Sequence, residues 1–224
     1  PCHVRRFDVT PDDRASIDSD PGQEAAVWEF LPYLLSGASI YLPKATVKHD
    51  IADLNRYFHS RDISVAFLPY GISEKFIQAE NRSLRLLLTT GRRLRGELTG
   101  DYRVANCYGP PESTMVTCCF PVNKADENIP IGSPIDNTRL YVLDRWKRLL
   151  PVGIPGRLYI SGQGVAAGYI NRQELTGERF LSTQDLKSPD LPPEILFRTD
   201  HQVRWLPGGI LEFMGSTPTT ETDE

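Results

Sequence analysis

The sequence predicts an α/β protein in which a mostly parallel, helix-covered sheet is followed by a smaller antiparallel, barrel-like β subdomain. Two observations support this fold class. Up to Phe120, strand-like apolar segments alternate with amphipathic helical segments, the order that builds parallel sheets. After Phe120, short strand-like segments are separated by glycine and proline turns, which is typical of antiparallel sheets. We therefore expect an α/β subdomain over residues 1–120, a β-rich subdomain over 121–215 and a disordered, acidic tail over 216–224.

The first subdomain is expected to begin with Thr10 to Arg14 as a capped turn that opens a short helix. An amphipathic helix over 25–35 should end near Gly37, and a short buried strand should follow over 38–42. We then expect a helix over 50–60, a strand over 63–68, a helix over 71–78, and strands over 84–88 and 104–108. Ligands of such sheets bind beyond the carboxyl ends of the strands, where the loops after Leu68, Leu88 and Tyr108 should converge.

The second subdomain is expected to be mainly β. Its strands are predicted over 129–134, 139–143 and 157–162, with a helix over 173–181 and a polar loop over 182–193. The last element is a hairpin over 197–213, turning at Pro207-Gly208-Gly209.

Composition excludes several classes of function. The formal net charge is -4, so the composition gives no sign of the positively charged surface that binds nucleic acid. The four cysteines lack C-x-x-C spacing and the four histidines lack metal-binding spacing, so we expect reduced cysteines and no zinc site. No apolar run approaches 20 residues and no signal-like start is present, so we expect a cytoplasmic protein with no membrane partner.

The stretch from Asn106 to Glu112 has the character of a ligand-facing loop. Tyr108 offers a stacking plane, Gly109 gives backbone freedom, and Glu112 offers a carboxylate that could hold a metal ion. On its own the signal is weak, because an ordinary loop with a half-buried tyrosine and a solvated glutamate has the same pattern.

Five motifs in order make the loop more specific. Together they resemble the adenylation domains of nonribosomal peptide synthetases, in the superfamily of adenylate-forming acyl-CoA synthetases and luciferases, over about residues 7–215. The motifs are Thr10-Pro11-Asp12-Asp13-Arg14, Val27-Trp28-Glu29, Tyr108-Gly109-Pro110-Pro111-Glu112, the segment 156–169, and Phe197-Arg198-Thr199-Asp200.

The resemblance implies an enzyme that joins an amino acid carboxylate to ATP, releases pyrophosphate and passes the acyl group to a carrier-protein thiol. It implies ATP or AMP and Mg²⁺ as ligands: Asn106 and Tyr108 at adenine, beside Gly109, Glu112 at Mg²⁺, and Asp200 at the ribose. The amino acid pocket that it implies is lined by Glu24, Ala25, Trp28, Phe67, Leu88, Thr90, Cys107, Met115 and Val116. Each of three of these residues could instead have a purely structural role. Tyr108 could be an aromatic side chain at the edge of the core, Glu112 an acidic residue at the start of a helix, and Trp28 a core residue of a helix.

Several positions depart from the family pattern. Pro111 replaces a threonine whose hydroxyl contacts the α-phosphate, and proline has no donor. Gln23-Glu24 replaces a Phe-Asp pair that anchors the amine, and Asp200-His201 replaces the Gly-Asp of the ribose motif. Arg92 stands where the family commonly has glutamate. The family's phosphate loop and its C-terminal catalytic lysine have no counterpart in these 224 residues, so we expect a truncated and degenerate copy.

Three hypotheses remain. The first is an inactive, adenylation-like pseudoenzyme with a structural or docking role between neighbouring carrier-protein and condensation domains, with self-association as a further option. The second is a fragment of an active adenylation domain that makes an aminoacyl-AMP and loads a carrier thiol. The third is a non-catalytic nucleotide-binding module. The substitutions at Gln23, Pro111 and His201 favour the first, because excision alone does not change motifs inside a fragment.

Overall fold

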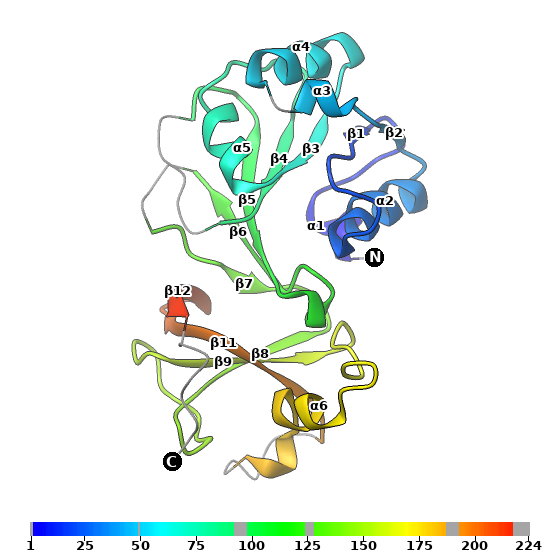
Figure 1. Ribbon diagram of the computed structural model, residues 1–224. Helices are drawn as coiled ribbons and strands as arrows, with labels where there is room; N and C mark the ends of the chain where they lie inside the picture. The colour runs from blue at the N-terminus through cyan, green and yellow to red at the C-terminus, as the bar shows by residue number, and fades with distance from the viewer. Residues whose placement is uncertain (1, 49, 92–97, 124–127, 187–192, 217–224) are drawn as a thin grey trace. The chain divides into compact units, whose positions relative to one another are not determined.

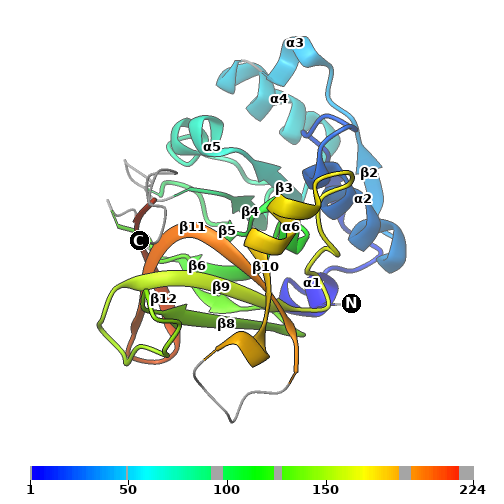
Figure 2. The ribbon, with the colours of Figure 1, turned by 60° about the horizontal axis from the view of Figure 1, so that its bottom comes forward.

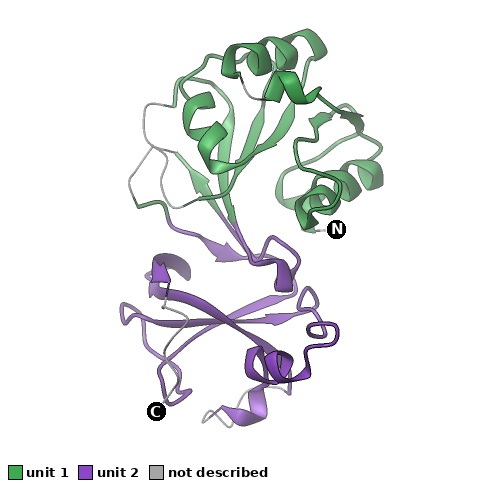
Figure 3. Ribbon diagram, viewed as in Figure 1, with its two compact units in different colours: residues 1–107, 120–129 green, residues 108–119, 130–224 purple. Residues whose placement is uncertain are grey.

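A computed structural model describes all of the chain except residues 1, 49, 92–97, 124–127, 187–192 and 217–224 (Figure 1). Its residues form two compact units, unit 1 with residues 1–107 and 120–129, and unit 2 with residues 108–119 and 130–224 (Figure 3). The division into domains at residue 120 stays a prediction. The compact units differ from it because the loop 108–119 associates with the second half of the chain.

Unit 1 is built on parallel strands, as the alternation of elements predicts. They are β1 (Arg14–Ser16), β2 (Ser39–Tyr41), β3 (Val65–Leu68), β4 (Leu86–Thr89) and β5 (Arg103–Tyr108), in the order β2-β1-β3-β4-β5. Every residue of β3 and β4 is buried, and Phe67 lies in register with Leu88. Continuous aliphatic strands of this kind suit a sheet covered on both faces. The sheet order continues through β6 (Cys118–Val122) to β7 (Ser133–Pro134), which pair antiparallel.

The helices of unit 1 are α1 (Cys2–Arg6), α2 (Glu24–Ser36), α3 (Ala45–Lys48), α4 (Ile51–Arg61) and α5 (Tyr70–Phe76). The predictions for α2, α4 and α5 are confirmed. Helix α2 ends at Gly37, which adopts the left-handed conformation that glycine tolerates best. Helix α4 begins at Asp50, whose carboxylate accepts a 2.9 Å hydrogen bond from the backbone N–H of Asp53. Helices α1 and α3 were not predicted.

Two predictions for the start of the chain are wrong. The segment Thr10 to Arg14 does not open a helix, because Asp13 turns into the sheet, where its carboxylate pairs with Arg85 at 2.6 Å and accepts a hydrogen bond from Ser64 at 2.7 Å. Strand β1 follows directly. The strand predicted as buried over 38–42 is also different, since β2 forms the edge of the sheet and none of its residues is buried.

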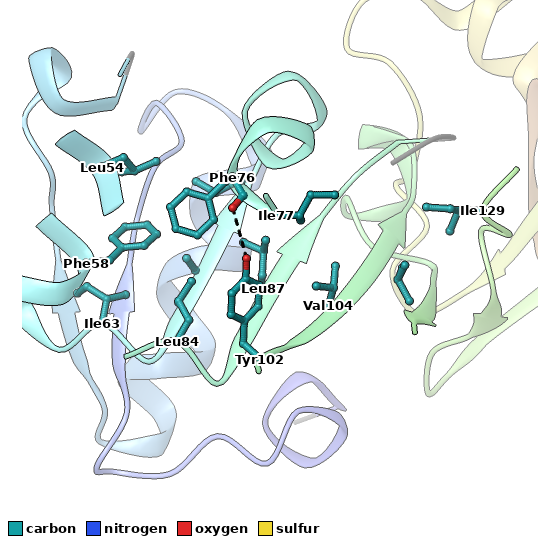
Figure 4. Close-up of a cluster of buried hydrophobic side chains, with 13 residues drawn as sticks. Leu54, Phe58, Ile63, Phe76, Ile77, Leu84, Leu87, Tyr102, Val104 and Ile129 are labelled. Atoms are coloured by element: carbon teal, nitrogen blue, oxygen red, sulfur yellow. Dashed lines mark hydrogen bonds between the residues drawn. The ribbon is translucent and has the colours of Figure 1, made fainter. Parts of the chain in front are cut away.

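The core of unit 1 lies between the sheet and helices α4 and α5. Phe58 and Phe76 are fully buried with ring centroids 5.3 Å apart, and the Tyr102 hydroxyl donates a 3.4 Å hydrogen bond to the Phe76 carbonyl (Figure 4). Within the described residues, no helix is both long and apolar enough to cross a membrane.

Unit 2 contains an antiparallel sheet, as predicted. Its strands are β8 (Thr138–Leu143), β9 (Gly156–Gly162), β10 (Phe180–Ser182), β11 (Ile195–Leu206) and β12 (Ile210–Ser216). The order is β10-β11-β9-β8, and β12 pairs with β11, so β9 runs between β8 and β11 (Figure 2). Helix α6 (Gln173–Arg179) and the short 3-10 helices η1 (Pro111–Ser113) and η2 (Thr183–Asp185) complete the unit. The predicted disordered tail lies, apart from Ser216, outside the described residues, as does Arg92.

Candidate functional site

The candidate site in unit 2 is organised by the loop that follows β5. The carbonyl of Tyr108 accepts hydrogen bonds from the backbone N–H of Thr117 at 2.7 Å and from the Thr117 hydroxyl at 2.9 Å, which closes the loop at its base. A Cβ atom at Gly109 would lie 2.2 Å from the Met115 carbonyl oxygen. Glycine is therefore needed here because two backbone segments approach closely.

The far side of the loop is strained. Thr114 and Met115 both have positive φ angles, 61° and 62°, and the backbone N–H of Val116 donates to the Thr114 carbonyl at 2.8 Å. Residues other than glycine rarely adopt this region, and such strain persists only where the surroundings impose it. Met115 itself is buried.

Glu112 is fixed by contacts with the segment that follows β9. Its carbonyl accepts a 2.8 Å hydrogen bond from the backbone N–H of Ala166, and its carboxylate oxygen Oε1 accepts a 2.6 Å hydrogen bond from the Tyr169 hydroxyl. Partial burial and the Glu112 carboxylate raise the pKa of Tyr169 to about 12, so the phenol stays protonated and remains a donor to Glu112. Thr114 adds a 2.7 Å hydrogen bond from its hydroxyl to the Gly164 carbonyl.

A bulge in β11 presents Asp200 and His201. Along the pairing of β11 with β9, the residues Thr199, Asp200 and His201 together oppose Leu158. The Thr199 hydroxyl donates to the Leu158 carbonyl at 2.8 Å and accepts from the His201 backbone N–H at 3.1 Å, which stabilises the bulge. Asp200 is not among the described residues with positive φ, so the glycine that the family has here is not required by backbone geometry.

His201 contacts the aromatic residue of the loop. Its Nδ1 atom shares a hydrogen bond with the Tyr108 hydroxyl, and its ring lies edge-on to Tyr108 and to Phe213, with centroid distances of 5.6 and 5.2 Å. The tyrosine that the resemblance assigns to adenine is thus in contact with the histidine that stands in place of the ribose-binding aspartate.

Asp200 is held by Arg179, a residue that the sequence reading did not single out. Nη1 of Arg179, in the last turn of α6, lies 2.5 Å from Oδ1 of Asp200. This hydrogen bond holds the pKa of Asp200 below its usual range and raises the pKa of Arg179. The sequence offered only a weak signal for it, since an arginine at the end of a short predicted helix is common.

Most residues of the expected amino acid pocket belong to unit 1. Trp28 lies edge-on to Phe67 with a centroid distance of 5.5 Å, and Phe67 lies in register with Leu88 on the neighbouring strand. Glu24 is exposed at the first residue of α2. The remaining unit 1 positions of the pocket are the buried Ala25 and Cys107 and the half-buried Thr90, whereas Met115 and Val116 are buried in unit 2. Asn106, which the resemblance assigns to adenine, is buried in unit 1.

Trp28 has a neighbour that the sequence reading missed. His3 lies edge-on to it at 4.7 Å, is buried, and in the described part of the chain neither of its ring nitrogens has a hydrogen-bond partner. Burial lowers the pKa of His3 to about 4, so the ring is neutral at pH 7. Only its position ahead of an aromatic-rich segment could have indicated this packing.

The residues present fit a magnesium-bound nucleotide poorly. A magnesium nucleotide usually takes one or two carboxylates from the protein, and Glu112 is of the right type, but its Oε1 accepts from Tyr169. Asp200 is paired with Arg179, and His201 is bonded to Tyr108. Among the described residues, no group of three or more histidine, cysteine, aspartate or glutamate side chains could hold a metal ion. Tyr108, Glu112 and Asp200, which the resemblance assigns to the nucleotide site, thus each have a side-chain partner within unit 2.

Comparison with known proteins gives consistent matches. The family described as AMP-binding enzyme matches residues 2–170. Bacitracin synthase 1 of Bacillus licheniformis is 40% identical over 213 residues, covering 95% of this chain and 4% of that protein. Surfactin synthase subunit 2 of Bacillus subtilis (strain 168) is 35% identical over 213 residues, covering 95% of this chain and 6% of that protein. The chain thus spans a small part of the length of these relatives.

Solved structures share the fold. The nonribosomal peptide synthetase FmoA3 (S1046A) superposes with a TM-score of 0.86 at 25% identity, over 96% of this chain and 24% of that chain. The N-terminal subdomain of NpsA from Klebsiella oxytoca, in complex with 3-hydroxybenzoyl-AMSN, has a TM-score of 0.80 at 20% identity, over 94% of this chain and 56% of that chain. An artificially fused adenylation-PCP di-domain from the same organism, NpsA-ThdA, has a TM-score of 0.80 at 21% identity, over 94% of this chain and 41% of that chain.

Proposed function

The chain belongs to the AMP-binding enzyme family, and from this premise we propose that it is a degenerate part of a nonribosomal peptide synthetase adenylation core that does not activate amino acids. Its role in the synthetase is structural: it is a folded spacer or docking surface between neighbouring domains. In this proposal the chain is a pseudoenzyme, whereas its parent family consists of ATP-dependent ligases.

The observation that carries the proposal is the internal pairing of the nucleotide-facing residues. Tyr108 contacts His201, Glu112 accepts from Tyr169, and Asp200 is paired with Arg179. A nucleotide would have to break these contacts before it gained its own, and His201 cannot accept from two ribose hydroxyls as a carboxylate does. Ligand binding is therefore opposed by interactions that the free protein already has.

The substitutions also weaken any remaining chemistry. Removing one preorganised polar contact to a transition state costs about 2 to 4 kcal/mol. Pro111 lacks the hydroxyl donor, His201 replaces the ribose carboxylate, and Glu24 places the amine-binding carboxylate one methylene further out. Because placement at the reacting centre matters to within about 1 Å, these changes act together against catalysis.

Two alternatives have support of their own. The retained motif order and the 40% identity to Bacitracin synthase 1 support a fragment of an active domain, which would form an aminoacyl-AMP from ATP and Mg²⁺ and load a carrier thiol. The retained Asn106, Tyr108 and Glu112 support a non-catalytic module that binds adenine nucleotide. For partners, the adenylation-PCP fusion among the structural neighbours supports a carrier protein as one neighbour, and a condensation domain and a second copy are further candidates.

Exchange of pyrophosphate into ATP separates these functions. The purified chain is incubated with ATP, Mg²⁺, labelled pyrophosphate and pools of amino acids, and full-length Bacitracin synthase 1 serves as the positive control. The proposal predicts no amino-acid-dependent exchange above background, and exchange by this chain would contradict it. Calorimetric titration with magnesium ATP is the second arm: measurable binding without exchange would favour the nucleotide-binding module.

A further inference from the structure

The connection between β8 and β9, residues 144–155, exposes both apolar and cationic side chains. In Figure 2 it extends beyond the end of the two strands. Of the eight exposed large apolar side chains in the described part of unit 2, four lie in this connection, with exposed fractions of 47 to 60%. We call them and the cations between them the β8–β9 loop surface: Arg145, Trp146, Lys147, Arg148, Leu149, Val152 and Ile154.

Asp144 fixes the turn that carries Trp146. One oxygen of its carboxylate accepts hydrogen bonds from the backbone N–H groups of Trp146 at 2.8 Å and of Arg148 at 2.9 Å. Nε of Arg148 donates to the other oxygen at 2.8 Å. Lys147 has a φ angle of 62°, and its backbone N–H donates to the Asp144 carbonyl at 3.0 Å. The turn is thus held by its own contacts, and Trp146 is left 49% exposed.

The second half of the loop is anchored to the sheet at two points. The backbone N–H of Leu150 donates to the Val142 carbonyl at 2.9 Å, and that of Gly153 donates to the Trp205 carbonyl at 2.8 Å. The aliphatic side chains of the β8–β9 loop surface stay exposed although the backbone beside them is fixed. Their exposure is therefore a feature of the folded loop.

The loop is positively charged in an acidic chain. Residues 144–155 carry a formal charge of +2, from three cations and Asp144, whereas the whole chain carries -4. Arg148 is paired with Asp144. Arg145 and Lys147 have no ion pair with any residue that the structure describes. Two cations beside exposed apolar side chains are therefore available to an anionic partner.

The surroundings of the Trp146 ring narrow the choice of partner. Cζ of Arg145 lies 4.1 Å from the ring centroid, and Cζ of Arg148 lies 4.7 Å from it. A nucleic acid base binds a tryptophan by stacking on the ring, but here two guanidinium groups already lie over it. In the headgroup region of a membrane, an indole lies at the polar boundary, and neighbouring guanidinium groups bind phosphate.

The projecting form of the loop also favours a lipid surface. A headgroup region accepts a projecting loop without a complementary shape, whereas a protein partner has to supply one. The other hairpin of unit 2, between β11 and β12, turns at Pro207, Gly208 and Gly209, which are exposed but carry neither charge nor a large apolar side chain. The combination of cations and apolar side chains is thus a property of the β8–β9 loop and not of every hairpin in the unit.

We propose that the β8–β9 loop surface binds the headgroup region of an anionic phospholipid membrane. Trp146 and the aliphatic side chains enter the headgroup region, and Arg145 and Lys147 contact lipid phosphates. The sequence predicted no membrane partner because it lacks an apolar run near 20 residues, but binding at a surface needs no spanning segment. The inference concerns unit 2 alone, and it goes beyond the proposed loss of activity without depending on it.

Vesicle co-sedimentation tests the inference. The purified chain is mixed at about 0.1 M salt with vesicles of phosphatidylcholine that contain about one-third phosphatidylserine, and with vesicles of phosphatidylcholine alone. We expect binding to the anionic vesicles to be at least about tenfold stronger, and to be lost near 1 M salt, where charges are screened within about 3 Å. One Lys or Arg near an anionic surface strengthens binding about fivefold. Arg145→Ala with Lys147→Ala should therefore weaken binding by about 25-fold, and Trp146→Ala by at least about fivefold.

The matched controls lie elsewhere in unit 2. Ile170 is 90% exposed and Arg172 is also exposed, so Ile170→Ala and Arg172→Ala remove an apolar and a cationic side chain outside the loop. Both should bind the anionic vesicles like the unsubstituted chain. Urea unfolding checks the fold of each variant. If Trp146→Ala lowers the free energy of unfolding, Val152→Glu replaces it, because this side chain is 60% exposed and the added charge should repel the vesicles.

The opposite results would overturn the proposal. These are equal binding to anionic and neutral vesicles, equal loss in the loop variants and the controls, or no binding to vesicles at all. In the last case, self-association that Trp146→Ala abolishes would identify a second copy as the partner instead, and binding of a single-stranded oligonucleotide that the same change abolishes would identify nucleic acid. Pyrophosphate exchange is not part of this readout, so this proposal and the proposed inactivity fail independently.

Discussion

The hydroxyl of Tyr108 shares a hydrogen bond with Nδ1 of His201, two residues 93 positions apart. The first ends β5 and the second lies in the bulge of β11, and both stand at positions that bind nucleotide in the family that the motifs resemble. Their contact turns a possible ligand site into an internal interaction of unit 2.

This contact should appear as an energetic coupling. In a double-mutant cycle of Tyr108→Phe and His201→Phe, we expect the free energies of unfolding to differ from additivity by about 1 kcal/mol, the usual net value of one hydrogen bond. Denaturant unfolding of the four proteins measures it. Tyr57→Phe combined with His201→Phe is the control pair and should be additive, because Tyr57 lies in unit 1. Additivity of the Tyr108 pair would mean that the contact contributes nothing to stability.

The carboxylate of Glu112 should be visible in the titration of Tyr169. Glu112→Gln removes a negative charge and a charged acceptor next to the phenol, so the pKa of Tyr169 should fall from about 12 toward its ordinary value of 10. The shift should be partial, because burial is the larger cause. Ultraviolet difference titration against Tyr169→Phe isolates this tyrosine from the others. No change in pKa would show that the two side chains are not in contact.

Gly109 and Gly71 provide a matched pair of glycine substitutions. At Gly109 a Cβ atom would meet the Met115 backbone at 2.2 Å, whereas at Gly71, in α5, nothing lies within 4 Å. We expect Gly109→Ala to lower the free energy of unfolding by more than about 2 kcal/mol. Gly71→Ala should raise it by about 0.5 kcal/mol through helix propensity. Thermal unfolding measures both, and equal effects would be inconsistent with the close approach.

His3 should make stability fall in mild acid. In the unfolded chain it binds a proton near pH 6.5, but in the folded chain only near pH 4, because burial disfavours the charged ring. The unfolded state therefore binds more protons between these values, and stability present above pH 6.5 is lost as the pH falls toward 4. The loss is roughly 2 to 3 kcal/mol at about 1.4 kcal/mol per pKa unit.

The control for His3 is a second histidine. His3→Phe should remove most of the acid-dependent loss relative to the unsubstituted protein, measured as the free energy of urea unfolding between pH 7 and 4. His59→Gln, at an exposed position of α4, should retain it. If His3→Phe kept the same pH dependence, the buried neutral ring would not be its cause.

The sequence predicted the elements whose cause is local. The apolar spacing and Gly37 predict α2, and Asp50 followed by a periodic segment predicts α4. Where a distant residue decides the structure, the same reasoning failed. The segment Thr10 to Arg14 has the pattern of a capped turn that opens a helix, but Arg85, 72 positions from Asp13, draws the Asp13 carboxylate into the sheet.

In the candidate site, too, contacts between residues far apart in the sequence were not predicted. The motifs indicated Tyr108, Glu112 and Asp200, but not the side chains that engage them. Tyr169 and Arg179 are brought there by the segment after β9 and by α6, and no local pattern in the sequence marks such tertiary pairs. The sequence identified the motif residues, whereas the side chains that pair with them could be identified only from the structure.

The central claim is that the nucleotide-facing positions no longer support adenylation, and one chimera tests it directly. This chain replaces its matched 213 residues in the adenylation domain of Bacitracin synthase 1, once unchanged and once with Gln23→Phe, Glu24→Asp, Pro111→Thr, Asp200→Gly and His201→Asp. Amino-acid-dependent ATP–pyrophosphate exchange is measured for both. We predict background exchange with the unchanged insert and at least about a hundredfold more with the substituted one, since several contacts of about 2 to 4 kcal/mol are restored. Equal exchange by the two chimeras, with the unchanged insert well above background, would contradict the account.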